Sequence, residues 1–255
     1  MNNIKDKIII STQPEENFTE FAKPLEVLGA KVINLPMISV KESVISEQES
    51  VVLKNIQTVD WLIFTSKNGI IYFFKKLETL TGNINISKNI NIAVIGQKTG
   101  KELEKYGKVA DYISKSNLAE TFATELKNNV ITKNSKILLL LGNLAGNTIE
   151  NKLEGFANIT RINCYETYKP DYIDKHYLEI INNAQYDIII FTSSSGFHNF
   201  VEVFNSKENL KKLKIGSIGK STTKAIEEYG VKPLFTAQQS NTEGLISEIL
   251  KYYSN

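Results

Sequence analysis

The sequence predicts an α/β protein with two flavodoxin-like, doubly wound parallel-sheet domains joined by a two-stranded linker. Three observations predict this fold. Apolar runs such as residues 188–191 and 137–141 do not alternate with polar residues, which is typical of parallel strands buried on both faces. These runs alternate along the chain with amphipathic segments, as strand–helix units do. The same order of segments also occurs twice in the chain.

The first repeated segment is a strand that leads into a polar turn and a helix. It reads "DWLIFTSKNGIIYFF" at residues 60–74 and "DIIIFTSSSGFHNF" at residues 187–200. Each copy contains Asp, a short apolar run, Phe-Thr-Ser and a turn that ends in Gly. We therefore expect each copy to form a buried strand followed by a helix start.

The second repeated segment is "IAVIGQKTGKELEKYGKVADY" at residues 92–112 and "IGSIGKSTTKAIEEYGVKPLF" at residues 215–235. Each copy predicts a strand, a Gly turn, a helix of about eight residues and a second short strand. Gly107 and Gly230 stand where the helix ends, and glycine suits the left-handed backbone of that position.

Two further pairs complete the repeat. "SNLAETFATEL" at 116–126 matches "SNTEGLISEIL" at 240–250, and the Ser-Asn pair predicts a capped helix start. The first three pairs lie 127, 123 and 124 residues apart. Residues 7–36 and 136–163 both predict a strand, a polar turn, a helix, a Gly and a strand. An ordered repeat at nearly constant spacing indicates a duplicated domain of about five strands.

Two segments interrupt the alternation of strands and helices. They are "LPMISVKES" at residues 35–43 and "RINCYETYKPDY" at residues 161–172, both extended, rich in β-branched residues and marked by Pro. We interpret them as interdomain strands that pair with each other. The expected division is one domain of residues 1–34 and 171–255, a second domain of residues 43–157, and linker strands at 35–42 and 158–170.

Composition narrows the class of protein. The net charge of +2 and the absence of a basic block argue against a nucleic-acid partner. Cys164 is the only cysteine, so no disulfide within the chain is possible. The apolar stretch near the N-terminus is too short for a signal peptide, and no apolar run approaches the roughly 18 residues of a membrane helix. We expect a soluble cytoplasmic protein without a membrane partner.

The polar turns that follow the strands are the candidate binding elements. In open parallel sheets, ligands bind beyond the carboxyl ends of the strands. Free N–H groups and the helix dipole favour anions there, although Ser, Thr and Asn at these positions also serve simply as helix caps. The turns are Thr12-Gln13, Thr65-Ser66-Lys67-Asn68-Gly69, Gly96-Gln97-Lys98-Thr99, Gly142-Asn143, Ser193-Ser194-Ser195-Gly196 and Gly219-Lys220-Ser221-Thr222.

Several familiar chemistries do not fit these turns. Residues 219–222 read like the end of a phosphate loop, but Lys214 stands where the first Gly is required. A serine triad would need His176 or His198, and neither has a clear partner. No His, Cys or carboxylate cluster has metal-ligand spacing, and no strand leads into a Gly-x-Gly-x-x-Gly turn. We therefore expect no metal and no cofactor, and an enzyme that acts by positioning and hydrogen bonding.

The ordered motifs resemble the uroporphyrinogen-III synthase family. They are "FTSKNGI", "VIGQKTGKELEKYG", "CYET", "IIFTSSSG", "SIGKSTTKAIEEYG" and "SNTEGLISEI", and their order and spacing match across nearly the whole chain. The resemblance implies two flavodoxin-like domains joined by a two-stranded linker, with the N-terminal strand and helix packed in the C-terminal domain.

The resemblance also implies a reaction. Hydroxymethylbilane, a linear tetrapyrrole with eight carboxylates, would lose water and close to uroporphyrinogen III with its last pyrrole ring inverted, in the cleft between the domains. Spontaneous closure gives the uninverted isomer, so the protein must hold the ends of the substrate in the rarer geometry. A monomer is expected, which would receive its substrate by transient transfer from the preceding deaminase.

The resemblance assigns roles to particular residues. Tyr165 of "CYET" matches the linker tyrosine proposed in the family as proton donor, and a phenol with a pKa near 10 is protonated at pH 7. A half-buried aromatic residue without a catalytic role is the equally weighted interpretation, and a carboxylate of the substrate is another candidate acid. The expected substrate-binding residues are Thr12, Thr65, Ser66, Lys67, Gly96, Lys98, Thr99, Ser193, Ser194, Gly219, Lys220, Ser221 and Thr222.

The chain departs from the family at three turns. Gln13 stands where many members have Arg, and the turn at residues 142–147 lacks another Arg that is common in the family. Lys220 stands where the family often has Pro, and it could replace a lost cation. These changes leave open an altered affinity for the substrate. The alternative function is a two-domain protein that binds or senses a small molecule without catalysis.

Overall fold

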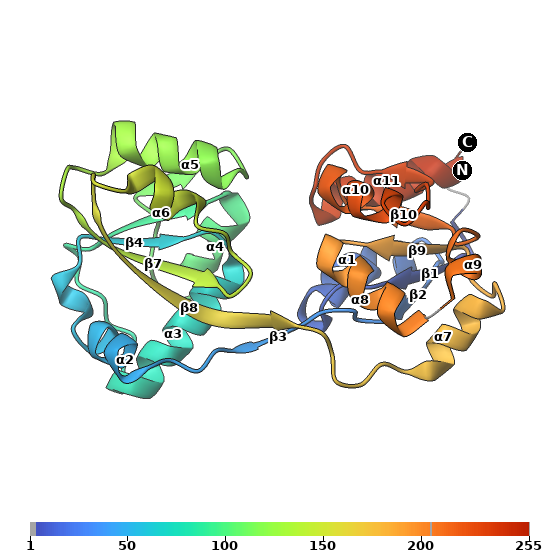
Figure 1. The fold of residues 1–255 in the computed structure, drawn as a ribbon, viewed down its shortest axis with the longest axis horizontal. Helices are drawn as coiled ribbons and strands as arrows, with labels where there is room; N and C mark the ends of the chain where they lie inside the picture. The colour runs from blue at the N-terminus through green and yellow to red at the C-terminus, as the bar shows by residue number, and fades with distance from the viewer. Residues whose placement is uncertain (1–3, 205, 255) are drawn as a thin grey trace. The chain divides into compact units, whose positions relative to one another are not determined.

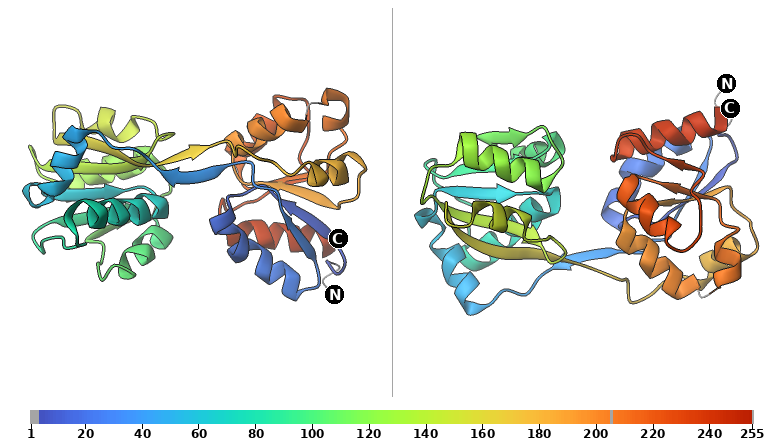
Figure 2. Two further views of the ribbon diagram at one scale, coloured as in Figure 1. Left: turned by 90° about the horizontal axis from the view of Figure 1, so that it is seen from below. Right: turned by 45° about the horizontal axis from the view of Figure 1, so that its top comes forward.

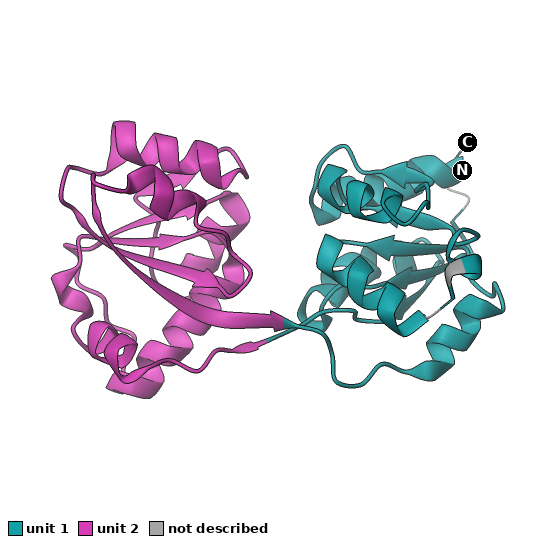
Figure 3. Cartoon of the chain, viewed as in Figure 1, with its two compact units in different colours: residues 1–40, 168–255 teal, residues 41–167 magenta. Residues whose placement is uncertain are grey.

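The computed structural model describes residues 4–204 and 206–254. The chain forms two compact units: residues 1–40 with 168–255 make unit 1, and residues 41–167 make unit 2 (Figure 3). Each unit is a mostly parallel sheet with helices on both of its faces (Figure 1; other views in Figure 2). The predicted fold class is confirmed.

The sheet of unit 1 has five parallel strands in the order β11-β10-β9-β1-β2. Helices α1 and α11 supply Phe21 and Leu245 to the core on one face of the sheet, and α7 and α8 supply Ile181 and Phe200 on the other. The strands are β1 (Ile8–Ser11), β2 (Lys31–Asn34), β9 (Ile188–Phe191), β10 (Ile215–Ser217) and β11 (Phe235–Thr236). The helices are α1 (Glu15–Val27), α7 (Lys175–Asn182), α8 (Ser194–Phe204), α9 (Lys207–Leu210), α10 (Lys220–Glu227) and α11 (Thr242–Ser254).

The second sheet has six strands in the order β3-β8-β7-β4-β5-β6, and all of it lies in unit 2 except the start of β3 and the last residue of β8. Helix α3 packs Phe73 and Leu77 on one face, while α5 and α6 pack Phe122 and Leu153 on the other. The strands are β3 (Ser39–Glu42), β4 (Trp61–Phe64), β5 (Asn91–Ile95), β6 (Tyr112–Ser114), β7 (Lys136–Gly142) and β8 (Asn158–Tyr168). The helical segments are α2 (Glu47–Lys54), the 3-10 turn Ile56–Thr58, α3 (Lys67–Thr81), α4 (Gln97–Glu104), α5 (Ala119–Glu125), the π-helical turn Leu126–Val130 and α6 (Thr148–Leu153).

The repeat predicted from the sequence corresponds to equivalent strands of the two sheets. The order β6-β5-β4-β7-β8 in unit 2 matches β11-β10-β9-β1-β2 in unit 1. The chain order differs, because the counterparts of β7 and β8 come first in unit 1. The N-terminal strand and helix therefore lie within the same unit as the C-terminal residues.

The Asp that opens the first repeated segment has the same role in both units. Asp60 Oδ2 accepts a hydrogen bond of 2.7 Å from the N–H of Lys136, the first residue of β7. Asp187 Oδ2 accepts a bond of 2.8 Å from the N–H of Ile8, the first residue of β1. Strands β7 and β1 are equivalent, so each Asp ties the start of its own strand to the start of the neighbouring strand.

The expected segment boundaries differ from the structure at the linker. Residues 158–167 fall within unit 2, where β8 pairs with β7 from Lys136↔Asn158 onward. The expected linker strand 158–170 is therefore largely an integral strand of this sheet. Its predicted partner, β3, is the neighbouring edge strand. The long register with β7 explains the difference, since residues 158–165 gain main-chain hydrogen bonds by pairing with β7 along its whole length.

The predicted helix ends have mixed outcomes. Gly107 and Gly230 have φ values of 66° and 72°, so the predicted left-handed conformation is confirmed. In the second Ser-Asn pair, Asn241 Oδ1 accepts a hydrogen bond from the N–H of Gly244 at the start of α11. In the first pair the prediction was wrong, because the residue before α5 is Leu118 and makes no side-chain cap. There Ser116 forms a turn instead, and its Oγ accepts from the N–H of Leu118.

No helix within residues 4–204 and 206–254 has both the length and the apolar character needed to cross a membrane.

Candidate active site

Ser66 makes two polar contacts at the carboxyl end of the sheet in unit 2. It precedes α3, and its Oγ accepts a hydrogen bond of 3.1 Å from the N–H of Gly69. Oγ also lies 3.0 Å from the hydroxyl of Tyr165. The same side chain therefore caps a helix and contacts the tyrosine that was predicted to donate a proton.

Tyr165 lies near the end of β8, with its ring between α3 and the end of β7. The ring stacks on Tyr72 of α3 with centroids 6.0 Å apart. A Cβ added to Gly142 would lie 2.5 Å from Cζ of Tyr165, so only glycine leaves room for the ring. Burial raises the pKa of the phenol, and the hydrogen bond with Ser66 opposes this rise only in part. The hydroxyl is therefore protonated throughout the neutral range.

The neighbouring Cys164 is an unsuitable nucleophile. Its side chain is 0% exposed, and burial raises the pKa of the thiol to about 12. The nearby ammonium of Lys76 lowers the pKa of the thiol and offsets only part of that rise. Of these two adjacent residues, Tyr165 is the one with a polar group at a partly open position.

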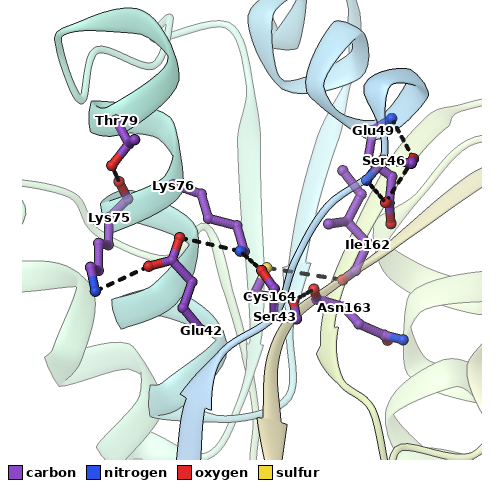
Figure 4. Close-up of polar contacts among 10 residues, drawn as sticks. All are labelled: Glu42, Ser43, Ser46, Glu49, Lys75, Lys76, Thr79, Ile162, Asn163 and Cys164. Carbon is purple, nitrogen blue, oxygen red and sulfur yellow. Dashed lines mark hydrogen bonds and ion pairs between the residues drawn. The ribbon is translucent and has the colours of Figure 1, made fainter.

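The buried Lys76 of α3 binds the end of strand β3 (Figure 4). Lys76 of α3 is 3% exposed, and its ammonium lies 3.3 Å from Glu42 Oε1 and donates to the carbonyl of Ser43. Ser43 Oγ in turn donates to the carbonyl of Asn163 on β8. Lys75 pairs with the other carboxylate oxygen of Glu42 at 3.0 Å. These contacts join α3, the end of β3 and β8 within unit 2.

A hollow of about 190 Å³ lies at the carboxyl ends of β4, β5 and β7. Thr65 is one of its polar lining residues, together with Asn117 and Thr148. Asn117 and Thr148 were not among the expected binding residues, although both lie in repeated segments, because Asn117 was assigned to a helix cap and Thr148 to the start of a helix. The apolar lining comes from Ile95, Ala119, Leu141, Ala145, Gly146 and Ile149.

Helix α4 begins without a side-chain cap. Its first residue is Gln97, and Gly96 before it has φ of 76°, a conformation that favours glycine. Lys98 is exposed in the first turn, whereas Thr99 is 6% exposed and faces inward. Lys67 is the half-buried first residue of α3. Gly96 and Lys98 therefore lie at an open helix start, where the amide groups favour an anion.

The equivalent turns of unit 1 bring several hydroxyls together. Ser193 Oγ accepts a bond of 3.0 Å from the N–H of Gly196, which repeats the cap formed by Ser66. Ser194 Oγ lies 3.2 Å from Ser221 Oγ, so the structure joins the turns after β9 and β10. Gly219 directly precedes α10, which begins without a side-chain cap, as α4 does after Gly96.

A hollow of about 670 Å³ lies beside the start of α10. Lys220, Ser221, Lys224 and Glu227 of α10 line it, together with Thr236, Ala237, Gln238 and Ser240. Thr223, which the sequence reasoning did not name, also lines this hollow, and its Oγ1 lies 2.6 Å from Oγ1 of Thr236. The predicted cation Lys220 is therefore at the surface of a concave, polar site.

Two predicted binding residues of unit 1 are turned inward. Thr12 is 1% exposed, and its hydroxyl donates a bond of 2.8 Å to the carbonyl of Ile190. Thr222 is 3% exposed on the buried side of α10. Gln13, which replaces the arginine common in the family, is 5% exposed. Side-chain contact between these three residues and a ligand would need a local rearrangement.

No group of three or more His, Cys, Asp or Glu side chains in the described part of the chain could hold a metal ion. The fold and the turns instead define a class of protein with two flavodoxin-like units that present hydroxyls, lysines and helix N-termini at the carboxyl ends of their strands.

The family model described as uroporphyrinogen-III synthase HemD matches residues 19–247. The chain belongs to the uroporphyrinogen-III synthase family, as its motifs predicted. This family membership supports the predicted cyclising lyase of tetrapyrrole biosynthesis over a protein that only binds a small molecule.

Curated relatives are similar to this chain over most of its length. The uroporphyrinogen-III synthase of Chlorobaculum parvum is 25% identical over 236 residues, which cover 89% of this chain and 91% of that protein. The uroporphyrinogen-III synthase of Synechococcus elongatus is 26% identical over 253 residues, which cover 95% of this chain and 94% of that protein. The porphyrin biosynthesis protein HemD of Ruminiclostridium josui is 26% identical over 95% of this chain, which spans 48% of that longer protein.

Solved structures share the fold. The uroporphyrinogen-III synthetase of Helicobacter pylori has a TM-score of 0.63 at 20% identity and covers 96% of this chain and 99% of its own. A mutant uroporphyrinogen III synthase of Thermus thermophilus has a TM-score of 0.61 at 15% identity, with coverage of 97% and 99%.

Proposed function

We propose that the protein is a uroporphyrinogen-III synthase that closes hydroxymethylbilane to uroporphyrinogen III. The observation that carries the proposal is the family match over residues 19–247, combined with Tyr165 held against Ser66 at a distance of 3.0 Å. The substrate ends in a hydroxymethyl group, which must leave before the ring can close.

Tyr165 is the proposed acid for this step. Its phenol donates a proton to the departing hydroxyl, so water leaves and a cationic azafulvene remains. The raised pKa keeps the proton on Tyr165 in the neutral range. The ring that attacks next is the last pyrrole, and the proton that this ring later loses restores the balance of the reaction. No step of the proposed mechanism requires a cofactor or a metal.

The strand-end turns are the proposed binding elements for the eight carboxylates. In unit 2 these are the uncapped start of α4 with Lys98, and the hollow lined by Thr65. In unit 1 they are the uncapped start of α10 and the hollow lined by Lys220 and Ser221. Amide groups at helix starts bind carboxylates without long charged side chains. This supports binding in a chain that lacks the two arginines common in the family.

A coupled assay tests the function. Porphobilinogen and its deaminase supply hydroxymethylbilane, and oxidation followed by chromatography separates isomers I and III. With the protein present, isomer III should predominate; without it, only isomer I should form. Only isomer I in the presence of folded protein would refute the proposal.

Tyr165→Phe tests the acid in the same assay. We expect a fall in kcat of about 10²-fold, since positioned acid catalysis contributes about 10² to 10⁴. An unchanged kcat would transfer the role of acid to a carboxylate of the substrate.

We further propose that the protein works as a cytoplasmic monomer that accepts its substrate from the deaminase. Sedimentation equilibrium tests the first part, and the coupled assay with a diffusional trap for hydroxymethylbilane tests the second. A dimer at assay concentration would contradict the first part. The second part would fail if a diffusional trap for hydroxymethylbilane abolished isomer III completely.

A further inference from the structure

A β-bulge directs the side chain of Tyr165. The pairing of β7 with β8 runs in register to Leu141↔Asn163 and then shifts to Gly142↔Tyr165, so Cys164 is passed over. Alternation along a regular strand would place Tyr165 on the face opposite Cys164. Instead, Tyr165 packs against the same apolar cluster as Ile162 and Cys164. Bulges re-aim side chains in this way, and this one turns the phenol toward α3.

Arg161 holds the loop on the β7 side of the bulge. It is the only arginine of the chain, and its guanidinium makes five hydrogen bonds. Two of them go to loop carbonyls, at 3.3 Å to Gly142 and 2.8 Å to Ala145. The remaining acceptors are Asn147 Oδ1, Glu150 Oε1 and Asn163 Oδ1, at 2.8 to 3.0 Å.

Asn143 closes the bulge on its other side. Its Oδ1 accepts a bond of 2.9 Å from the N–H of Thr167, and its Nδ2 donates a bond of 3.2 Å to the carbonyl of Thr167. Its own N–H donates to the carbonyl of Tyr165 at 3.1 Å. The side chain thus mimics a strand residue and continues the pairing after the shift in register.

We propose that Arg161 and Asn143 are positioning residues that hold the bulge closed and thereby keep the Tyr165 hydroxyl against Ser66. Neither side chain contacts the phenol itself, and both act through the loop that contains Gly142. The inference rests on the proposed function, because it assigns these residues to the orientation of the proposed acid.

The guanidinium fork is essential to this role. Lysine would keep the positive charge beside Glu150 but cannot reach two loop carbonyls and two amide oxygens at once. Arg161→Lys therefore removes loop geometry while it preserves charge. Asn143→Ala removes the two side-chain bonds to Thr167 without any change in charge. Lys152→Gln is the matched control, because Lys152 lies on α6 and pairs only at the surface with Glu120, 3.1 Å away.

The test is a double-mutant cycle with Tyr165→Phe. In the wild-type background, Arg161→Lys and Asn143→Ala should each lower kcat for isomer III about tenfold with KM nearly unchanged. In the Tyr165→Phe background each should lower kcat further by less than about twofold, because residues that act through one group are not additive. Lys152→Gln should leave kcat unchanged in both backgrounds.

Equal losses in the two backgrounds, or an unchanged kcat in both variants, would overturn the inference. If Arg161→Lys does not melt cooperatively, Asn143→Ala carries the same test. A wild-type protein that makes only isomer I would refute the proposed function instead.

In that case the tyrosinate absorbance still decides the inference. The tyrosinate absorbance of each protein is measured against pH, and that of the same protein carrying Tyr165→Phe is subtracted from it. The remaining absorbance reports the ionisation of Tyr165 alone. A bulge that has opened to water should ionise Tyr165 at lower pH than in the wild type. Identical titrations in all variants would again contradict the positioning role.

Discussion

The hydroxyl of Tyr165 lies 3.0 Å from Oγ of Ser66, and that oxygen also accepts a hydrogen bond from the N–H of Gly69. The cap of α3 and the orientation of the phenol therefore depend on one atom. Ser193 forms the same cap in unit 1 through the N–H of Gly196. The repeat thus supplies an internal control, because Ser193 caps its helix as Ser66 does but has no hydrogen bond to a tyrosine among those described.

Ser66→Ala and Ser193→Ala should each lower the free energy of unfolding by about 1 kcal/mol, the usual loss for a helix N-cap. Urea unfolding measures this change. Only Ser66→Ala should also raise the pKa of Tyr165, since the bond from Ser66 lowers that pKa. A shift of the Tyr165 titration in Ser193→Ala would show that the effect is not local.

Gly142→Ala should destabilise the protein by about 1 to 3 kcal/mol, because the new methyl group would overlap the ring of Tyr165. It should also reduce the yield of isomer III. Gly146→Ala in the same loop is the control: its added Cβ has its nearest neighbour 4.0 Å away, at Thr148 Oγ1. Thermal unfolding should separate the two, and equal melting temperatures would contradict the packing described for Gly142.

Lys76→Met should cost about 2 kcal/mol of stability, since it leaves the carbonyl of Ser43 and the carboxylate of Glu42 without their buried donor. Lys75→Met removes the exposed partner of the same carboxylate and should change stability by less than about 0.5 kcal/mol. Urea unfolding of both variants at neutral pH gives the comparison. Equal losses would mean that the burial of Lys76 has no energetic consequence.

The ion pair of Asp187 should make stability depend on pH. Burial alone would raise the pKa of Asp187, but the N–H of Ile8 and the ammonium of Lys7 hold it below the ordinary value of 3.8. A carboxyl with a lowered pKa in the folded state stabilises the protein above its unfolded pKa, and this contribution disappears as the pH falls through the folded value.

Urea unfolding of the wild type and Asp187→Asn, from neutral pH to below 3.8, tests this dependence. The variant should be less stable at neutral pH and the difference should shrink in acid. A constant difference at all pH values would show that the charge of Asp187 makes no contribution.

The sequence predicted most of the fold because local patterns repeat. The strands at 60–64 and 187–191 follow from their unbroken apolar runs, and the turns at Gly107 and Gly230 follow from backbone conformation. The boundary of the linker was harder to predict from the sequence. Whether residues 158–167 extend a sheet or leave it depends on pairing with β7, which is a contact between distant segments.

The site was predictable in its location but not in its contacts. Motifs placed Ser66, Ser193 and Lys220 at strand ends, where the structure has them. The inward orientation of Thr12 and Thr222 depends on the rotation of each helix and strand within the core, which a turn motif does not encode. The neighbourhood of Gly142 and Tyr165 depends on a bulge, whose single extra residue leaves no pattern in the sequence.

The interrupted order of unit 1 has a consequence for the chain as it leaves the ribosome. Strand β1 lies between β2 and β9, and β9 is made after all of unit 2. At translation rates of roughly 5 to 20 residues per second, β1 waits roughly ten to thirty seconds for this neighbour. Unit 2 is continuous, so it can fold first. During that interval β1 can pair with β2 on one side, but its other edge stays without β9 until the rest of unit 1 is made.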